Sequence, residues 1–404
     1  MPDPHGAPSA EPSSSPRSAS APPFGGAWTV PGGDDPGLRF GWFVPTSGDT
    51  AHLGRSAVEI PPSLDHFLDV ALAAERAGFE YLLVPVQTAC WEAYVTCSFL
   101  AARTERIAPL LAARAGFVAP TVMAKMLTTF DQLSQGRLKV NLITGGSAAE
   151  MAADGLFADH DERYDLLDET VELMKQVWTA DGRVDFAGRH HRVDGALVLP
   201  RPYQRPHPPI YLGGASEAAK DVSVRHADVH LFWGDTPARI AAEVADLHRR
   251  AALSGRTAPL RAGMRLQVIV REREADAWDA AHELVAGASD HRRDKVRALW
   301  DQSTANMRQQ ELADAEDLHV GGHPHLWAGI ARLRPGAGVA VVGDPDQVAA
   351  TLDEFVEAGC RDFCLSGYPH DVEATRFGSL VMERFAGRIA TPVVDLVRAA
   401  AASG

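Results

Sequence analysis

Cysteine is scarce in this sequence, and its placement excludes two classes of protein. The 404 residues contain only Cys90, Cys97, Cys360 and Cys364. Four scattered cysteines are too few for a disulfide framework in a chain of this length, and none forms the C-x-x-C pairing typical of zinc sites. We therefore expect a cytoplasmic protein without disulfide bonds and without a bound metal.

Basic charge and long apolar runs are also scarce. Lys and Arg total 39 against 53 Asp and Glu, a formal net charge of −14, whereas binding to nucleic-acid phosphates needs a basic face. No apolar run approaches the roughly 20 residues of a membrane-spanning helix. The sequence therefore predicts a soluble protein that binds neither nucleic acid nor a membrane, and the charge leaves room for a local basic pocket for one small anion.

The chain does contain enough apolar residues, 46%, to form a large core. Residues 1–37 differ from the rest, because they are rich in Pro, Ser, Ala and Gly and lack the basic start and apolar stretch of a secretory signal. This composition predicts a disordered tail. From residue 38 onward, short apolar runs alternate with amphipathic helical stretches.

Eight of the apolar runs predict strands, and helical segments lie between them. The runs lie at residues 38–44, 79–85, 106–114, 137–144, 209–214, 228–234, 264–270 and 361–367. Eight βα units in about 365 residues predict an α/β fold, a (β/α)8 TIM barrel over residues 38–404. Two insertions interrupt the repeat. Residues 181–208 predict a β-hairpin, and the polar residues 287–328 predict a mobile lid.

Candidate site residues follow the predicted strands, because chemistry in such a barrel sits at the carboxyl ends of the strands. Cys90 follows the second strand at the start of a helix, where the helix N-terminus lowers a thiol's pKa, so we expect a reactive or hydrogen-bonding cysteine. The alternative is a small buried side chain that fills space. Asn141 and Thr144 end the fourth strand and point to the barrel mouth, and Glu150 lies on the next turn.

Two further groups of residues suit an anion. Gly213 and Gly214 open a helix, so that backbone amides and the Ser216 hydroxyl can approach a phosphate. Arg265 lies on one face of the seventh strand, Arg334 precedes a glycine-rich loop, and Tyr368 follows the eighth strand. Together they suit a sulfonate, phosphate or carboxylate. The alternative is structural ion pairing with the many acidic residues.

Other motifs predict no chemistry. The stretch "GASEA" lacks the last glycine of a serine-hydrolase elbow, and "PGAGVAVVGD" lacks the third glycine of a dinucleotide fingerprint. His319, His323 and His325 have no cysteine or carboxylate at ligand spacing, so we interpret them as part of a solvated loop.

Taken together, the motifs resemble one family. From about Phe40 to about Phe385 the chain resembles the two-component, reduced-flavin-dependent alkanesulfonate monooxygenases of the bacterial-luciferase-like barrels. The blocks that carry the resemblance are "WFVPTSGDTAHLG", "PTVMAKMLTTFDQLSQGR", "NLITGGSAAEMAADG", "DHDERY", "PPIYLGGAS", "RPGAGVAVVGD" and "LSGYPHDVEA". The resemblance implies FMN, used as FMNH2, with O2 as co-substrate. It further implies a separate NAD(P)H-dependent flavin reductase, a small anionic organic substrate and a homo-oligomer.

The resemblance also assigns roles to residues. It places Asn141, Thr144 and Glu150 near the flavin ring, and Arg163, Tyr164 and Ser216 toward its phosphate. The catalytic residues that it implies are Cys90, Arg265, Arg334 and Tyr368. The insertion at 287–328 corresponds to the family's mobile loop, which closes over the bound flavin.

Two positions depart from the family. Gln267 stands where a histidine usually follows the strand-seven arginine, and Ser47 replaces the histidine of the usual "PTHGD" motif. Each change replaces an ionisable imidazole by a neutral hydrogen-bonding group. We expect a monooxygenase that desulfonates an organosulfonate to an aldehyde and sulfite. The alternatives are a non-sulfonate substrate, an F420-dependent oxidoreductase and a flavin-binding protein without catalysis.

Overall fold

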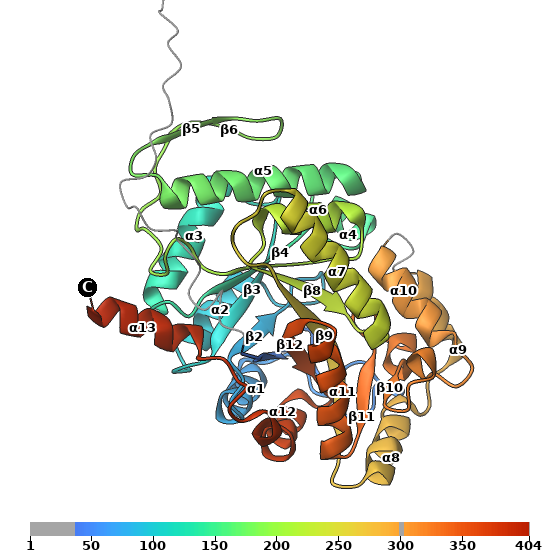
Figure 1. The fold of residues 1–404 in the computed structure, drawn as a ribbon. Coiled ribbons are helices and arrows are strands. Elements are labelled where there is room, and N and C mark those ends of the chain that lie inside the picture. The colour runs from blue at the N-terminus through green and yellow to red at the C-terminus, as the bar shows by residue number, and fades with distance from the viewer. Residues whose placement is uncertain (1–36, 299–302, 404) are drawn as a thin grey trace, which may run out of the picture.

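Eight parallel strands form a closed barrel in this computed structural model, which describes residues 37–298 and 303–403 (Figure 1). Neighbouring strands pair in the order β1-β2-β3-β4-β7-β8-β9-β12, and β12 pairs back onto β1. The strands are β1 (Arg39–Phe43), β2 (Tyr81–Val84), β3 (Ala108–Arg114), β4 (Lys139–Ile143), β7 (Ile210–Gly213), β8 (Val229–Trp233), β9 (Arg261–Val270) and β12 (Cys360–Ser366). The predicted (β/α)8 barrel is confirmed. The predicted tail lies outside the described residues except for Gly37.

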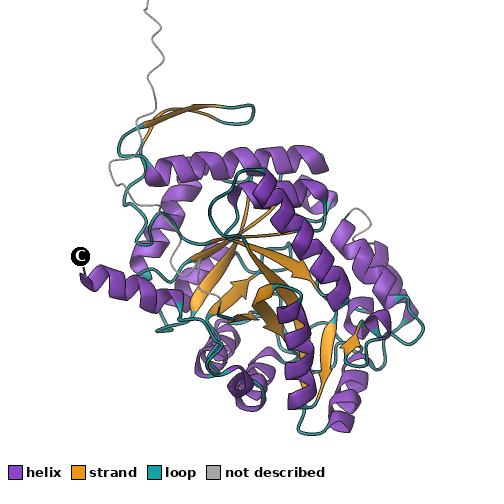
Figure 2. Ribbon diagram, viewed as in Figure 1, coloured by secondary structure: helices purple, strands orange, loops and turns teal. Residues whose placement is uncertain are grey.

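Helices surround this barrel (Figure 2). They are α1 (Leu64–Arg76), α2 (Ala93–Ala101), α3 (Pro120–Leu133), α4 (Ala148–Ala153), α5 (His160–Thr179), α6 (Glu217–His226), α7 (Pro237–Leu253), α8 (Glu274–Val285), α9 (Asp290–Ala298), α10 (Thr304–Ala313), α11 (Pro345–Glu357), α12 (His370–Leu380) and α13 (Val393–Ser403). Short 3-10 turns lie at Val320–Gly322, Gly329–Arg332 and Met382–Phe385. Among the described residues, no helix is long and apolar enough to cross a membrane.

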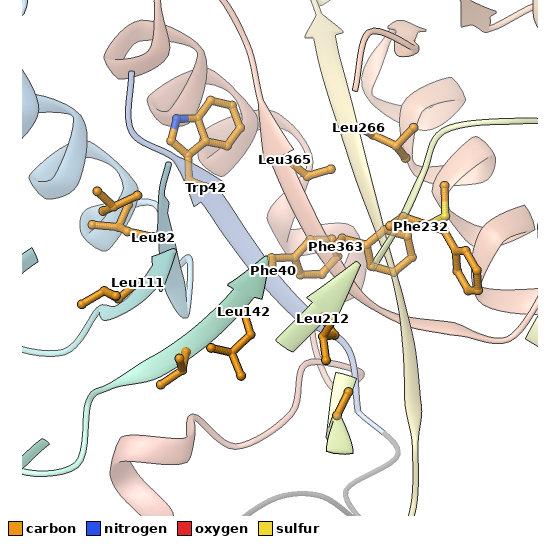
Figure 3. Packing of buried hydrophobic residues seen from close by; sticks show 14 of the residues in the cluster. Phe40, Trp42, Leu82, Leu111, Leu142, Leu212, Phe232, Leu266, Phe363 and Leu365 are labelled. Atoms are coloured by element: carbon orange, nitrogen blue, oxygen red, sulfur yellow. The ribbon is translucent and has the colours of Figure 1, made fainter. Parts of the chain in front are cut away.

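The barrel strands carry two sets of side chains, one facing outward to the helices and one facing inward. Outward-facing residues such as Phe40, Trp42 and Phe363 pack under the helices and form the main hydrophobic core (Figure 3). Inward-facing residues alternate with them, because successive side chains of a strand point to opposite faces. On β9 this rule places Arg265 inside the barrel, as the sequence predicts.

Ion pairs close the amino-terminal end of the barrel interior. The buried Glu80 carboxylate accepts from Arg39 at 2.7 Å and pairs with Lys139 at 2.8 Å. Nearby, Arg261 pairs with the buried Asp362 at 2.7 Å. Each buried charge therefore has an opposite charge beside it, the arrangement that burial of ions requires. The candidate site lies at the other end of the barrel, where the strands have their carboxyl ends.

Both insertions adopt secondary structure. Within residues 181–208 the predicted hairpin is present as β5 (Val184–Ala187) and β6 (Arg192–Ala196), which stand beyond α5, apart from the barrel (Figure 1). Residues 287–328 contain α9, α10 and β10 (Leu326–Trp327), whereas residues 299–302 lie outside the described residues. β10 pairs with β11 (Ala340–Gly343), and β11 pairs with the carboxyl-terminal residues of β9. These two short strands are not among the predicted strands.

Candidate active site

A cavity of about 350 Å³ opens at the carboxyl ends of the barrel strands. Its walls combine apolar side chains, such as Phe43 and Phe232, with polar and charged ones. Eight of the ten predicted site residues line it: Asn141, Thr144, Glu150, Arg163, Tyr164, Ser216, Arg265 and Arg334. The other two, Cys90 and Tyr368, lie just behind the lining. The fold therefore brings together residues that are up to 278 positions apart in the chain, from Cys90 to Tyr368.

Arg265 provides a buried positive charge at this cavity. Only 5% of the residue is exposed, and its guanidinium lies 4.8 Å from the centre of the Phe43 ring. One terminal nitrogen donates to the carbonyl oxygens of Leu266 and Cys364 and to Ser366 Oγ. Burial lowers the pKa of Arg265, and the charge of Arg334 lowers it further, against an opposing effect of Cys364. Among the described residues no carboxylate pairs with Arg265.

Arg334 provides a second positive charge on the same aromatic ring. Its guanidinium lies 5.8 Å from the Phe43 ring centre. One terminal nitrogen donates to the Tyr368 hydroxyl at 2.7 Å, which places that tyrosine behind the cavity wall. No ion pair to Arg334 is formed within residues 37–298 and 303–403. Structural ion pairing, the alternative that the sequence left open for these arginines, is therefore absent from the described part of the chain, and both charges are free to face an anion.

The opposite wall of the cavity has the features of a phosphate site. Ser216 caps α6, and its Oγ accepts from the Ala219 amide, so its hydroxyl hydrogen remains free to donate. Gly214 has φ +139°, and a Cβ there would lie 2.7 Å from the Ala219 side chain and 3.1 Å from the Tyr164 hydroxyl. The backbone therefore approaches the cavity where only glycine fits, at the positive end of a helix.

Arg163 completes this wall. It is 6% exposed, it donates to the Ala158 carbonyl at 3.0 Å, and its Nε is buried without a partner in the described residues. An unpaired guanidinium nitrogen beside a glycine cradle and a helix N-terminus fits a phosphate oxygen. These residues therefore fit the phosphate of FMN.

Glu150 has a partner that sequence reasoning missed. Its Oε1 accepts from Arg114 at 2.7 Å and from the Thr88 amide at 2.6 Å. Arg114 is the last residue of β3 and is 8% exposed. Its position at the carboxyl end of a predicted strand was the signal that could have found it. The carboxylate is held in place by this arginine, next to Asn141 and Thr144 in the cavity wall.

Cys90 differs from the sequence-based expectation. Burial raises the pKa of its thiol, and the neighbouring Thr46 and Ser47 side chains oppose this shift without cancelling it. The expected lowering of this pKa by a helix N-terminus is therefore wrong, and the expectation of a hydrogen-bonding cysteine stays a prediction. The causes are burial and the nearby charge of Glu150. The first amides of α2, which begins at Ala93, donate to the Glu92 carboxylate.

An unpredicted carboxylate–histidine cluster lies behind Tyr368. Asp49 accepts from His370 Nδ1 at 2.8 Å and lies 3.0 Å from His66 Nε2. Burial pushes the pKa of Asp49 up, but the charge and hydrogen bonds of His370 and the bond from His66 outweigh it and hold that pKa below its usual range. The hydrogen bond to Asp49 raises the pKa of His66. The His370 ring lies 4.9 Å from that of Tyr368.

The histidines of the insertion are engaged in hydrogen bonds. His319 Nδ1 bonds to the His323 carbonyl, His323 Nε2 to Glu354, and His325 Nδ1 to the Val342 carbonyl. All three are partly buried, so the interpretation as a freely solvated loop is wrong in that respect. In the part of the chain that the structure describes, no group of three His, Cys, Asp or Glu residues is placed to hold a metal ion.

Comparisons with known proteins agree with this architecture. A model of the luciferase-like monooxygenase family matches residues 38–362. Similar solved structures include riboflavin lyase (RcaE) with modified FMN and riboflavin: identity 19%, TM-score 0.73, and coverage of 90% of this chain and 96% of that one. Long-chain alkane monooxygenase (LadA) has 18% identity and a TM-score of 0.70, covering 90% and 95%. An F420-dependent secondary alcohol dehydrogenase has 16% identity and a TM-score of 0.61, covering 85% and 98%. The chain belongs to the luciferase-like monooxygenase family.

Proposed function

We propose that the protein is an FMNH2- and O2-dependent monooxygenase that acts on a small anionic organic molecule, with an organosulfonate as the leading candidate. One observation carries the proposal. Two guanidinium groups, Arg265 and Arg334, stack on one ring at the cavity and have no carboxylate partner among the described residues. A buried charge of this kind calls for an anion.

The opposite wall supports FMN as the cofactor. Arg163, Ser216 and the amides around Gly214 would hold the phosphate, and Asn141 and Thr144 would lie beside the ring. Glu150, fixed by Arg114, would lie on the same side. Reduced FMN, when bound, supplies the electrons with which O2 is reduced. The fingerprint of a nicotinamide-binding site is absent from the sequence, which supports a separate NAD(P)H-dependent flavin reductase as partner.

The residues of the chain have separable roles in this proposal. Arg265 and Arg334 bind the anionic head group and stabilise negative charge that develops on it. Tyr368, oriented by its bond from Arg334, holds a proton at its hydroxyl. Cys90, whose raised pKa keeps it a thiol, acts as a hydrogen-bond donor rather than as a nucleophile. The chain's own contribution is orientation, charge and exclusion of water.

Three further proposals concern the insertion, the oligomeric state and the location of the protein. The insertion 287–328 is proposed as a lid, because α10 supplies Asn306, Arg308 and Gln309 to the cavity wall. A homo-oligomer is supported by exposed apolar side chains on α2 and α3, among them Val95 and Met126. All four cysteines are free, which supports a cytoplasmic location.

A coupled assay tests the function. The protein is incubated with a flavin reductase, NADPH, FMN, O2 and a series of short and long alkanesulfonates, and sulfite is measured. We expect sulfite that requires both the protein and a sulfonate, and none with an Arg265→Met variant that still binds FMN. FMN binding without sulfite from any sulfonate would reject the organosulfonate and favour a different anion.

One second candidate has a specific observation in its favour. A structure with the same fold is an F420-dependent secondary alcohol dehydrogenase, so a deazaflavin could take the place of FMN. Oxygen dependence and cofactor preference distinguish the two candidates. The F420 candidate predicts turnover without O2 and binding of F420 in preference to FMN, and the monooxygenase predicts the reverse in both measurements.

A further inference from the structure

Three side-chain hydrogen bonds hold the loop at residues 334–338, which carries Arg334. Three of its consecutive residues, Gly336, Ala337 and Gly338, each use one backbone group to bond a buried amide side chain. The Gly336 N–H donates to Asn306 Oδ1 at 2.9 Å, and the Gly338 N–H donates to Gln309 Oε1 at 3.0 Å. Between them, the Ala337 carbonyl accepts from Gln267 Nε2 at 3.0 Å. The loop conformation therefore depends on side chains supplied from elsewhere.

Two of these amides come from the insertion. Asn306 and Gln309 lie on α10, and they are 4% and 2% exposed. Gln309 also donates to the Gly234 carbonyl at 2.8 Å, and Arg308 forms a paired bond to Asp235 at 2.6 and 3.0 Å. Both acceptors follow directly after β8. α10 therefore bridges the end of a barrel strand and the Arg334 loop.

The third amide connects this loop to the other arginine. Gln267 accepts from Ser366 Oγ at 2.6 Å, and Ser366 Oγ in turn accepts from Arg265 at 3.0 Å. A continuous chain of hydrogen bonds thus runs from Arg265 through Ser366 and Gln267 to the Ala337 carbonyl. An amide suits this position because it accepts at one atom and donates at the other without any change of protonation.

We propose that Gln267, Asn306 and Gln309 are positioning residues that set the distance between Arg334 and Arg265, so that the insertion completes the anion site. The identity of the anion in this inference rests on the proposed function, whereas the role of the three amides rests on the hydrogen bonds alone. Its consequence is a coupling: α10 cannot leave the barrel mouth without releasing the loop that carries Arg334. Anion binding and docking of α10 therefore stabilise each other, as linkage requires.

A matched pair of variants tests the proposal. Gln309→Met removes both bonds at nearly constant volume, whereas Gln310→Met makes the same change at the next residue, whose amide bonds the Ala331 carbonyl instead of the loop. Sulfate affinity is measured by thermal-shift titration at constant ionic strength, and FMN affinity by fluorescence quenching. We expect Gln309→Met to weaken sulfate binding by about tenfold, because the displaced Arg334 loses about one charged hydrogen bond to the anion, and to leave FMN affinity unchanged. Gln310→Met should change neither affinity, and sulfate affinity unchanged in Gln309→Met would overturn the proposal.

Hydrogen exchange at residue resolution gives a readout that needs no ligand. In Gln309→Met we expect faster exchange of the Gly336 amide, although its own partner Asn306 is intact, because the loop is held as a unit. If Gln309→Met speeds exchange at Gly338 alone, the three amides do not hold the loop as a unit, and the proposal is refuted. Asn306→Leu serves as the second variant and should accelerate Gly338 in the same way. A wild-type protein that binds FMN but not sulfate would reject the proposed anion site, and the exchange data would still decide the inference.

Discussion

Two arginines on one strand allow a sharp test of why Arg265 is buried. Arg261 and Arg265 both lie on β9, both face the barrel interior and are 8% and 5% exposed. Arg261 pairs with the fully buried Asp362, whereas Arg265 bonds only carbonyls and a hydroxyl within the described residues. The same substitution, Arg→Met, should therefore destabilise the protein strongly at Arg261 and change its stability little at Arg265.

The expected magnitudes follow from these contacts. Arg261→Met leaves the Asp362 carboxylate buried without its cation, which destabilises proteins by about 3–5 kcal/mol. Arg265→Met loses bonds to a charged donor, roughly 1.5–3 kcal/mol, and a ring contact of about 1–2 kcal/mol. It also removes a buried charge whose desolvation costs several kcal/mol. These effects nearly cancel, so we expect a change of at most about 1 kcal/mol in the free energy of unfolding.

Urea unfolding with and without sulfate measures both effects. Sulfate should stabilise the wild-type protein, by about 2.7 kcal/mol at a hundred times its dissociation constant, and should not stabilise Arg265→Met. If Arg265→Met proves as destabilising as Arg261→Met, Arg265 is a structural residue and the reasoning that assigns it to an anion is refuted.

Three further predictions concern the cofactor, the thiol and pH. Arg163→Leu should weaken FMN binding by about 10–100-fold, the effect of a bond to a charged group, and leave riboflavin binding unchanged, as measured by fluorescence quenching. Cys90, with its raised pKa, should react with iodoacetamide at pH 7.5 more slowly than free cysteine, as followed by mass spectrometry. His66 has a raised pKa, so its bond to Asp49 stabilises the fold below the unfolded pKa of about 6.5. That stability is lost as pH rises through the folded pKa, so urea midpoints should fall with pH more in the wild type than in His66→Gln.

Each of these has its own control. Arg189→Leu, at an exposed arginine that pairs with Asp165, should leave FMN affinity intact, and an equal loss of FMN and riboflavin in Arg163→Leu would contradict the phosphate assignment. Cys90→Ser identifies the alkylated peptide, and a Cys90 that reacts faster than free cysteine would contradict the effect of burial. Parallel pH profiles for the wild type and His66→Gln would show that the imidazole does not contribute.

The sequence alone determined the architecture, because alternating strand and helix patterns are local signals. The predicted eight strands match the barrel strands to within about three residues at each end. Period-two alternation also placed Arg265 on the inner face of β9. These features depend on residues that are close in sequence, and so the pattern of side chains was sufficient to find them.

Only the tertiary structure decided the pairing of side chains that are distant in the chain. Arg114 with Glu150, His370 with Asp49, and the insertion's Asn306 and Gln309 with the Arg334 loop are contacts between segments that no local pattern connects. The protonation of Cys90 was decided in the same way, because a thiol's pKa depends on its burial and on neighbours brought by the fold. Sequence periodicity fixes which face a residue occupies, and three-dimensional packing fixes which partner it meets there.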